Sequence, residues 1–202
     1  MVFKRNAWRL VALAVGLVAA VVLAGAVVAG QVGGIPSDEF QASLRNDASV
    51  RVADIPAQGA LPARGVFVQP TSTGHLCLWD APSAASRAKQ GGCNRADDPL
   101  AGRKLTISLA FDGGPDVHAI DDARLVGLAA GEIASLQVLM SDGTRRAIPM
   151  RREVAFASEA GQFRAFGYRF PASDFKRGLA PTSVIALDEH GAEVERLTTG
   201  YG

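Results

Sequence analysis

The sequence ASLQVLMSDGTRRAIPMR, residues 134–151, decides the fold class. Apolar and polar side chains alternate before the Ser-Asp-Gly at 141–143, and a second segment with apolar residues follows that turn signal. Alternation with a period of two is typical of a strand with one buried face. One face of the first segment carries Ala134, Leu136, Val138 and Met140. The stretch therefore predicts a β-hairpin of strands 134–140 and 145–151.

The length of the turn decides which side chains meet across this hairpin. A two-residue turn would place Ile148 on the face opposite to Leu136. A three-residue turn, with Gly143 in the left-handed region, sets Leu136 opposite Ile148 and Ala134 opposite Met150. Because only this register joins the apolar faces, we predict the three-residue turn with a bulge.

The same period-two pattern recurs between turn residues over the rest of the C-terminal part. Further strands are expected at 65–69, 75–79, 105–111, 117–121, 124–127, 153–157, 164–170, 183–187 and 193–198. Residues 81–103 are expected to be an irregular loop. Many short strands separated by Gly, Asp and Pro are typical of antiparallel sandwiches. We predict a mainly β, antiparallel β-sandwich-like domain over residues 63–202, preceded by a flexible linker over 31–62.

The N-terminal residues differ sharply in composition from this domain. Residues 1–30 carry three basic and no acidic side chains, whereas residues 31–202 carry 18 basic and 20 acidic ones. The apolar run from Leu10 to Gly30 would span about 31 Å as a helix, close to the roughly 30 Å of a bilayer core. It predicts a transmembrane signal-anchor helix in the lipid bilayer, with residues 1–9 cytoplasmic and the β-domain extracytoplasmic. The acidic balance of that domain argues against nucleic-acid binding.

A cleaved signal peptide is the alternative for the N-terminal segment. Residues 24–26 read Ala-Gly-Ala, a small-residue cleavage pattern, and cleavage after Ala26 would release a secreted domain. The apolar run continues to residue 29 without a polar stretch before that site, which favours the uncleaved anchor.

Two cysteines, Cys77 and Cys93, are separated by fifteen residues and lack the spacing of a zinc site. Outside the cytoplasm such a pair is expected to form a disulfide. Two free buried thiols are the alternative.

Several short motifs support this organisation. They are VFVQP, GHLCL and GGC within 66–93, VGLAAGEIASLQV at 126–138, SDGTRRAIPMR at 141–151 and VIALDEHG at 184–191. Over residues 64–198 the chain resembles membrane-anchored or secreted bacterial β-domain proteins of high-GC genomes. The resemblance implies a fold, a disulfide and turns, and it carries no activity over to this chain.

No catalytic motif such as G-x-S-x-G occurs, and no cofactor is expected. The densest polar cluster contains Asp112, Asp116, His118 and Asp122. On an extended segment Asp116 and His118 would share one face and be able to share a cation. The alternative is a tight turn followed by a solvated strand face.

Four arginines, Arg145, Arg146, Arg151 and Arg152, form a basic strip on the predicted hairpin. Such a strip would suit anionic lipid headgroups, an anionic polymer or an acidic partner. The alternative is an edge strand that charge protects against pairing with other strands.

These observations predict a non-enzymatic interaction or envelope-associated module. An envelope hydrolase or metal-dependent enzyme using His118 with the nearby aspartates is the alternative. A purely structural tethered domain is the third possibility.

Overall fold

The computed structural model describes residues 49–86, 90–114, 116–150, 156–158 and 161–200. The predicted anchor from Leu10 to Gly30, the residues before it and the site after Ala26 lie outside the described residues. In the part that is described, no helix is long and apolar enough to cross a bilayer. The described residues form antiparallel sheets, so the prediction of a mainly β domain is confirmed.

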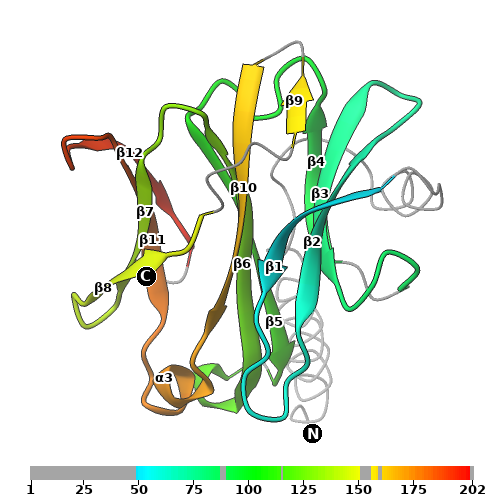
Figure 1. Cartoon of the computed structure of the whole chain (residues 1–202). Coiled ribbons are helices and arrows are strands. Elements are labelled where there is room, and N and C mark those ends of the chain that lie inside the picture. Colours follow the sequence, from blue (N-terminus) through cyan, green and yellow to red (C-terminus); the bar gives the residue numbers. More distant parts are fainter. Residues whose placement is uncertain (1–48, 87–89, 115, 151–155, 159–160, 201–202) are drawn as a thin grey trace, which may run out of the picture. The chain divides into compact units, whose positions relative to one another are not determined.

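The first sheet has four strands in the order β1-β2-β3-β4 (Figure 1). They span Val50–Ile55 (β1), Arg64–Pro70 (β2), His75–Ala81 (β3) and Gln90–Arg95 (β4). Cys77 lies directly opposite Cys93 on β3 and β4, and the two sulfur atoms are bonded at 2.02 Å. The predicted disulfide is therefore confirmed. Phe67 and Trp79 stack with their ring centroids 4.5 Å apart and are buried in one cluster with this disulfide.

Two of these strands lie where irregular structure was expected. Strand β1 falls in the expected linker 31–62, and a register shift between Arg51 and Ala53 breaks the alternation that would have revealed it. Strand β4 falls in the expected loop 81–103 and contains no large apolar side chain. A Cβ atom at Gly91 would lie 2.0 Å from the Leu78 carbonyl oxygen, so glycine allows β4 to approach β3.

The second sheet has the order β5-β6-β10-β9. Its strands span Leu105–Gly113 (β5), Ile120–Ala130 (β6), Gly161–Phe170 (β10) and Phe156–Ser158 (β9). Every residue of β6 except Asp121 is buried, which means that both faces of this strand are covered. A Cβ atom at Gly167 would lie 2.7 Å from Ile55 Cγ1 and 2.8 Å from Val66 Cγ2. Glycine at this position therefore allows the first sheet to pack closely on β10.

The third sheet has the order β12-β11-β7-β8 and contains the predicted hairpin. Its strands span Ser135–Met140 (β7), Arg145–Ile148 (β8), Pro181–Leu187 (β11) and Glu193–Thr198 (β12). Leu136 pairs with Ile148, and Gly143 has a φ of 82°, which confirms the three-residue turn and its register. The expected pairing of Ala134 with Met150 is wrong, because Met150 instead bridges to Phe166 of β10.

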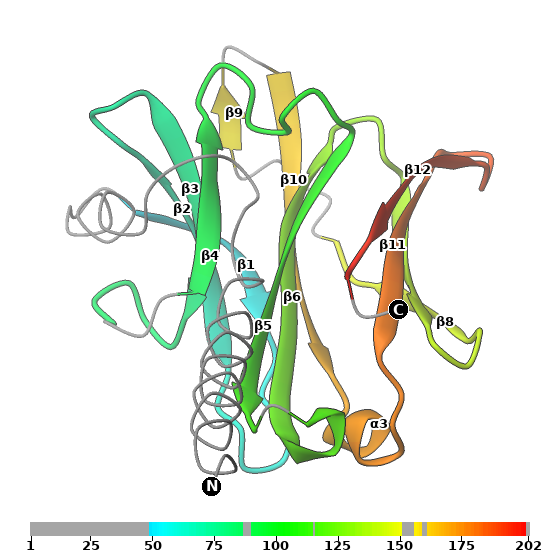
Figure 2. The same ribbon diagram turned by 180° about the vertical axis from the view of Figure 1, so that it is seen from behind.

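The middle sheet joins the other two. Strand β10 contacts β1 and β2 of the first sheet and β8 of the third, while β5 contacts β4 and β12. In the two opposite views of Figures 1 and 2, β6 and β10 lie between the first and the third sheet. One core cluster continues through all three sheets. The arrangement thus differs from a two-sheet sandwich, because strand β6 of the middle sheet is covered on both of its faces.

Two short elements connect strands at one end of the middle sheet. The 3-10 turn η1 (Val117–Ala119) precedes β6, and the helix α3 (Ala172–Lys176) follows β10. The prediction of a strand over 117–121 is wrong for residues 117–119, because the Asp116 side chain accepts a hydrogen bond from the His118 backbone nitrogen and closes a turn.

Candidate functional site

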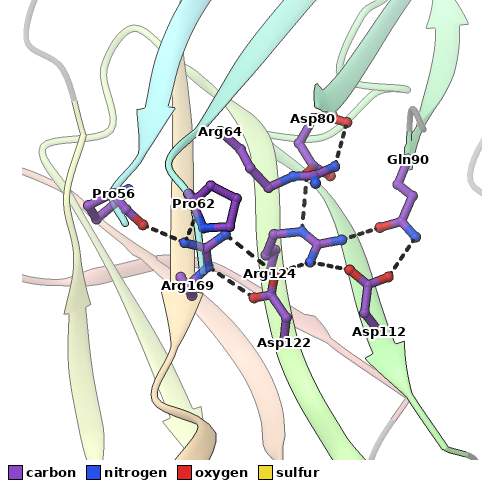
Figure 3. A network of polar contacts seen from close by, with 9 residues as sticks. All are labelled: Pro56, Pro62, Arg64, Asp80, Gln90, Asp112, Asp122, Arg124 and Arg169. Carbon is purple, nitrogen blue, oxygen red and sulfur yellow. Dashed lines mark hydrogen bonds and ion pairs between the residues drawn. The ribbon is translucent and has the colours of Figure 1, made fainter. Parts of the chain in front are cut away.

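A buried polar cluster lies between the first and second sheets (Figure 3). It contains the side chains of three arginines, three aspartates and one glutamine, and we call it the Arg124 cluster. Its members are Arg64, Asp80, Gln90, Asp112, Asp122, Arg124 and Arg169.

Strand register brings these side chains together. Asp112 of β5 lies opposite Asp122 of β6, and Arg124 of β6 lies opposite Arg169 of β10. Like charges directly opposite each other destabilise a sheet, so each pair needs charges of the other sign nearby. The alternation of β6 supplies them, because Asp122 and Arg124 are two residues apart and point to the same face. Asp80 reaches the cluster from β3 of the other sheet.

Arg124 is the centre of the cluster, and its side chain is 0% exposed. Its Nε donates to Asp80 at 3.1 Å, and its Nη1 donates to Asp112 at 2.7 Å and also to Asp122. Its Nη2 donates to Gln90 Oε1 at 2.5 Å. Burial lowers the pKa of Arg124, but the hydrogen bond to Asp112 and the carboxylate charges outweigh burial and raise it. All three guanidinium nitrogen atoms are therefore engaged by neighbours within the chain.

The two other arginines extend the cluster toward the β1–β2 connection. Arg169 donates from Nε to Asp122 at 2.9 Å and from Nη1 to the carbonyl oxygens of Pro56 and Pro62 at 2.7 and 3.0 Å. Arg64 Nε donates to Asp80 at 2.5 Å. The cluster therefore connects strands of both sheets and holds the segment between β1 and β2.

Asp112 is the exposed member, with 52% of its side chain accessible to solvent. Burial raises the pKa of Asp112, but its hydrogen bond and ion pair with Arg124 outweigh burial and hold the pKa below its usual value. The carboxylate is therefore ionised near neutral pH and acts as a counter-ion of Arg124.

The predicted cation site is not assembled. Asp112 and Asp122 bind Arg124, whereas Asp116 caps η1. The His118 imidazole instead lies on α3, with Nδ1 at 3.2 Å from the Lys176 carbonyl oxygen. Among the residues that the structure describes, no group of three or more His, Cys, Asp or Glu side chains is placed to hold a metal ion. The expectation that Asp116 and His118 share an extended face fails because residues 117–119 form a turn.

The predicted basic strip is also divided. Arg146 pairs with Asp174 of α3, with 2.9 Å between Nη2 and Oδ1, and Arg177 pairs with the same carboxylate at 2.9 Å. Burial raises the pKa of Asp174, but the hydrogen bonds from the two arginines outweigh it and lower the pKa. Arg145 is exposed on β8. Arg151 and Arg152 lie outside the described residues.

Most members of the Arg124 cluster were absent from the sequence-based candidates. Asp112 and Asp122 were considered as cation ligands, whereas Arg64, Asp80, Gln90, Arg124 and Arg169 were not singled out. A usable signal was present at Asp80, which follows Leu76 and Leu78 at the alternate positions that face the core. A charged residue in such a position needs a partner, because burying an unpaired charge is costly.

Comparison of the chain with protein-family models, with curated proteins and with solved structures finds no match.

Proposed function

We propose that this chain is a membrane-anchored, extracytoplasmic domain that acts by binding a partner rather than by catalysis. The observation that carries this proposal is the engagement of Arg124. Each of its three guanidinium nitrogen atoms donates to a neighbour within the chain, namely Asp80, Asp112, Asp122 or Gln90, so the most concentrated group of charged side chains described holds two sheets together. A cluster with this arrangement makes a rigid scaffold, and rigid scaffolds suit binding surfaces.

The location in this proposal is supported by the disulfide and by the sequence before the domain. A Cys77–Cys93 bond is suited to an oxidising compartment. The basic residues before the apolar run favour a cytoplasmic N-terminus, which directs the β-domain outward.

Thiol labelling and protease digestion test this location in spheroplasts that produce the full chain with a cytoplasmic N-terminal tag. We expect the β-domain to be digested from outside while the tag is protected. We also expect the two cysteines to react with a maleimide only after denaturation and reduction. A protected β-domain, or thiols that react without reduction, would overturn the proposed location.

Photo-crosslinking in the native cells tests the binding role. A benzoylphenylalanine residue is placed in the full chain at four exposed positions, Val50, Ala147, Glu189 and Val194, and at buried Phe166 as the control. We expect an adduct of defined mass at some exposed positions and none at Phe166. Absence of an adduct at all four exposed positions would overturn the binding function.

A further inference from the structure

A groove of about 550 Å³ opens between the second and third sheets, away from the Arg124 cluster. It is lined by the segment before β5, the end of β6, the start of β10 and the exposed edge of β12. Its volume lies in the range of ligand sites, which is about 300–1,000 Å³. Phe163 and Leu100 contribute buried apolar surface to its lining.

A β-bulge presents an apolar side chain to this groove. Ala186 pairs with Glu195 and Leu187 pairs with Glu193, so Val194 is the extra residue on β12. Val194 is 44% exposed. Among the described residues, Val50 is the one other large hydrophobic residue whose side chain is exposed. Bulges commonly re-aim a side chain next to a functional site. Val194 therefore offers an apolar contact that the fold itself leaves uncovered.

The segment before β5, which also lines the groove, contains an ordered turn. Ala101 has a φ of 52° and is the one described non-glycine residue with a positive φ. The Asp98 side chain accepts a hydrogen bond from the Gly102 backbone nitrogen at 2.9 Å, which orders this turn. A wall that is ordered before binding loses little conformational entropy when a ligand arrives.

The charges at the rim leave one cation available. Lys104 Nζ pairs with Glu132 at 2.6 Å, and the Lys104 backbone nitrogen donates to Glu195 at 2.5 Å. Arg103 is exposed and makes no ion pair or side-chain hydrogen bond within the described part of the chain. A guanidinium group binds carboxylates with two parallel hydrogen bonds. The groove therefore offers Arg103 to bind a carboxylate and Val194 to contact an apolar side chain.

We infer that this groove binds an extended peptide segment of a partner protein, in which a carboxylate adjoins a large apolar side chain. The carboxylate pairs with Arg103 and the apolar side chain packs against Val194 and Phe163. This inference rests on the proposed binding function and deepens it by naming a site and the chemistry of the partner.

Fluorescence anisotropy with defined peptides tests the inference on the full chain in mild detergent. The probes are sixteen labelled hexapeptides that place one Leu, Ile, Phe or Val next to one Asp or Glu, in either order, between Gly and Ser. Matched probes carry Asn or Gln in place of the acid, or Ser in place of the apolar residue. We expect at least one acidic probe to bind with a Kd below about 1 mM, a weak affinity on the scale of such complexes.

Two pairs of variants locate the binding. Val194→Asp should weaken the best probe by about tenfold or more, as loss of a central contact does. Arg103→Gln should weaken the acidic probe and leave its amide counterpart unchanged. The matched controls, Val50→Asp and Arg95→Gln, change an exposed valine and an exposed arginine elsewhere and should leave the Kd unchanged. Thermal melting of each variant checks that it is folded.

The inference is overturned if no probe binds below 1 mM, if Val194→Asp has no effect, or if amide and acidic probes bind equally. In each of these cases the binding function still stands if a photo-crosslink forms at any of the four exposed positions. It falls only when no exposed position forms an adduct.

Discussion

Replacement of Arg124 by methionine removes the centre of the buried ionic cluster with little loss of side-chain volume. Asp80 and Asp122 then stay buried, and each of them loses its hydrogen bond to Arg124, while Asp112 loses its own and turns to solvent. Breaking a buried ion pair by removing one partner costs about 3–5 kcal/mol. The lower end applies here, because Asp80 keeps Arg64 and Asp122 keeps Arg169.

We therefore expect Arg124→Met to lower the free energy of unfolding by about 3 kcal/mol. For a chain of this size that corresponds to a decrease in Tm of about 6–12 °C. The measurement is urea unfolding of the full chain in mild detergent, followed by Trp79 fluorescence in a Trp8→Phe background. The matched control is Arg95→Met, because Arg95 pairs with Asp97 at the surface, with side chains 73% and 65% exposed. This control should show no measurable change.

A double-mutant cycle with Asp112→Asn shows whether the loss comes from the contacts in Figure 3. The substitution should destabilise the wild-type chain by about 1 kcal/mol, as for a partly exposed charged hydrogen bond, and should have little effect when Arg124 is already methionine. A loss below about 1 kcal/mol for Arg124→Met, the value of an exposed pair, would refute the reasoning. It would mean that water satisfies these charges.

Three further changes test other parts of the fold. Replacing Cys77 and Cys93 together by alanine should lower the free energy of unfolding by about 3 kcal/mol, because the disulfide no longer restricts the unfolded chain by closing a loop with a sequence separation of 16. Reducing the wild-type chain before urea unfolding should have the same effect. Asp174→Asn should lower stability by about 2 kcal/mol at pH 7, because its carboxylate binds Arg146. The pKa of Asp174 is lowered on folding, so its contribution is present above the ordinary value of 3.8 and is lost as pH falls through the folded value. Urea titrations at pH 7, 4 and 3 should show the variant approaching the wild type, and an unchanged difference would contradict the pairing. Gly143→Ala should lower the free energy of unfolding by about 1 kcal/mol, because Gly143 has a φ of 82°, and Gly143→Asn should lower it less. Equal Tm values for both variants and the wild type would rule out the bulged turn.

Local sequence patterns predicted most of the strands, but they missed two strands and mistook one turn for a strand. The hairpin at 134–148 was predicted with its register, because alternation of apolar side chains and the left-handed preference of Gly143 are local properties. Strands β1 and β4 were missed, because a bulge interrupts one and glycines with a cysteine replace apolar side chains in the other. The turn at 117–119 was mistaken for a strand, because the capping bond from His118 to Asp116 competes with extension.

The sequence by itself determined a β-rich chain and a hairpin register that joins apolar faces, and it predicted the disulfide with two free thiols as the alternative. Only the tertiary structure decided how the charges are used. Asp80 and Arg124 are 44 residues apart, and Asp122 and Arg169 are 47 apart, yet each pair is in direct contact. Period-two alternation states which side chains share a face, but it does not state which sheet covers that face. Two of the aspartates that suggested a cation site, Asp112 and Asp122, are therefore counter-ions of Arg124, which is buried because the first sheet packs over this face of the second.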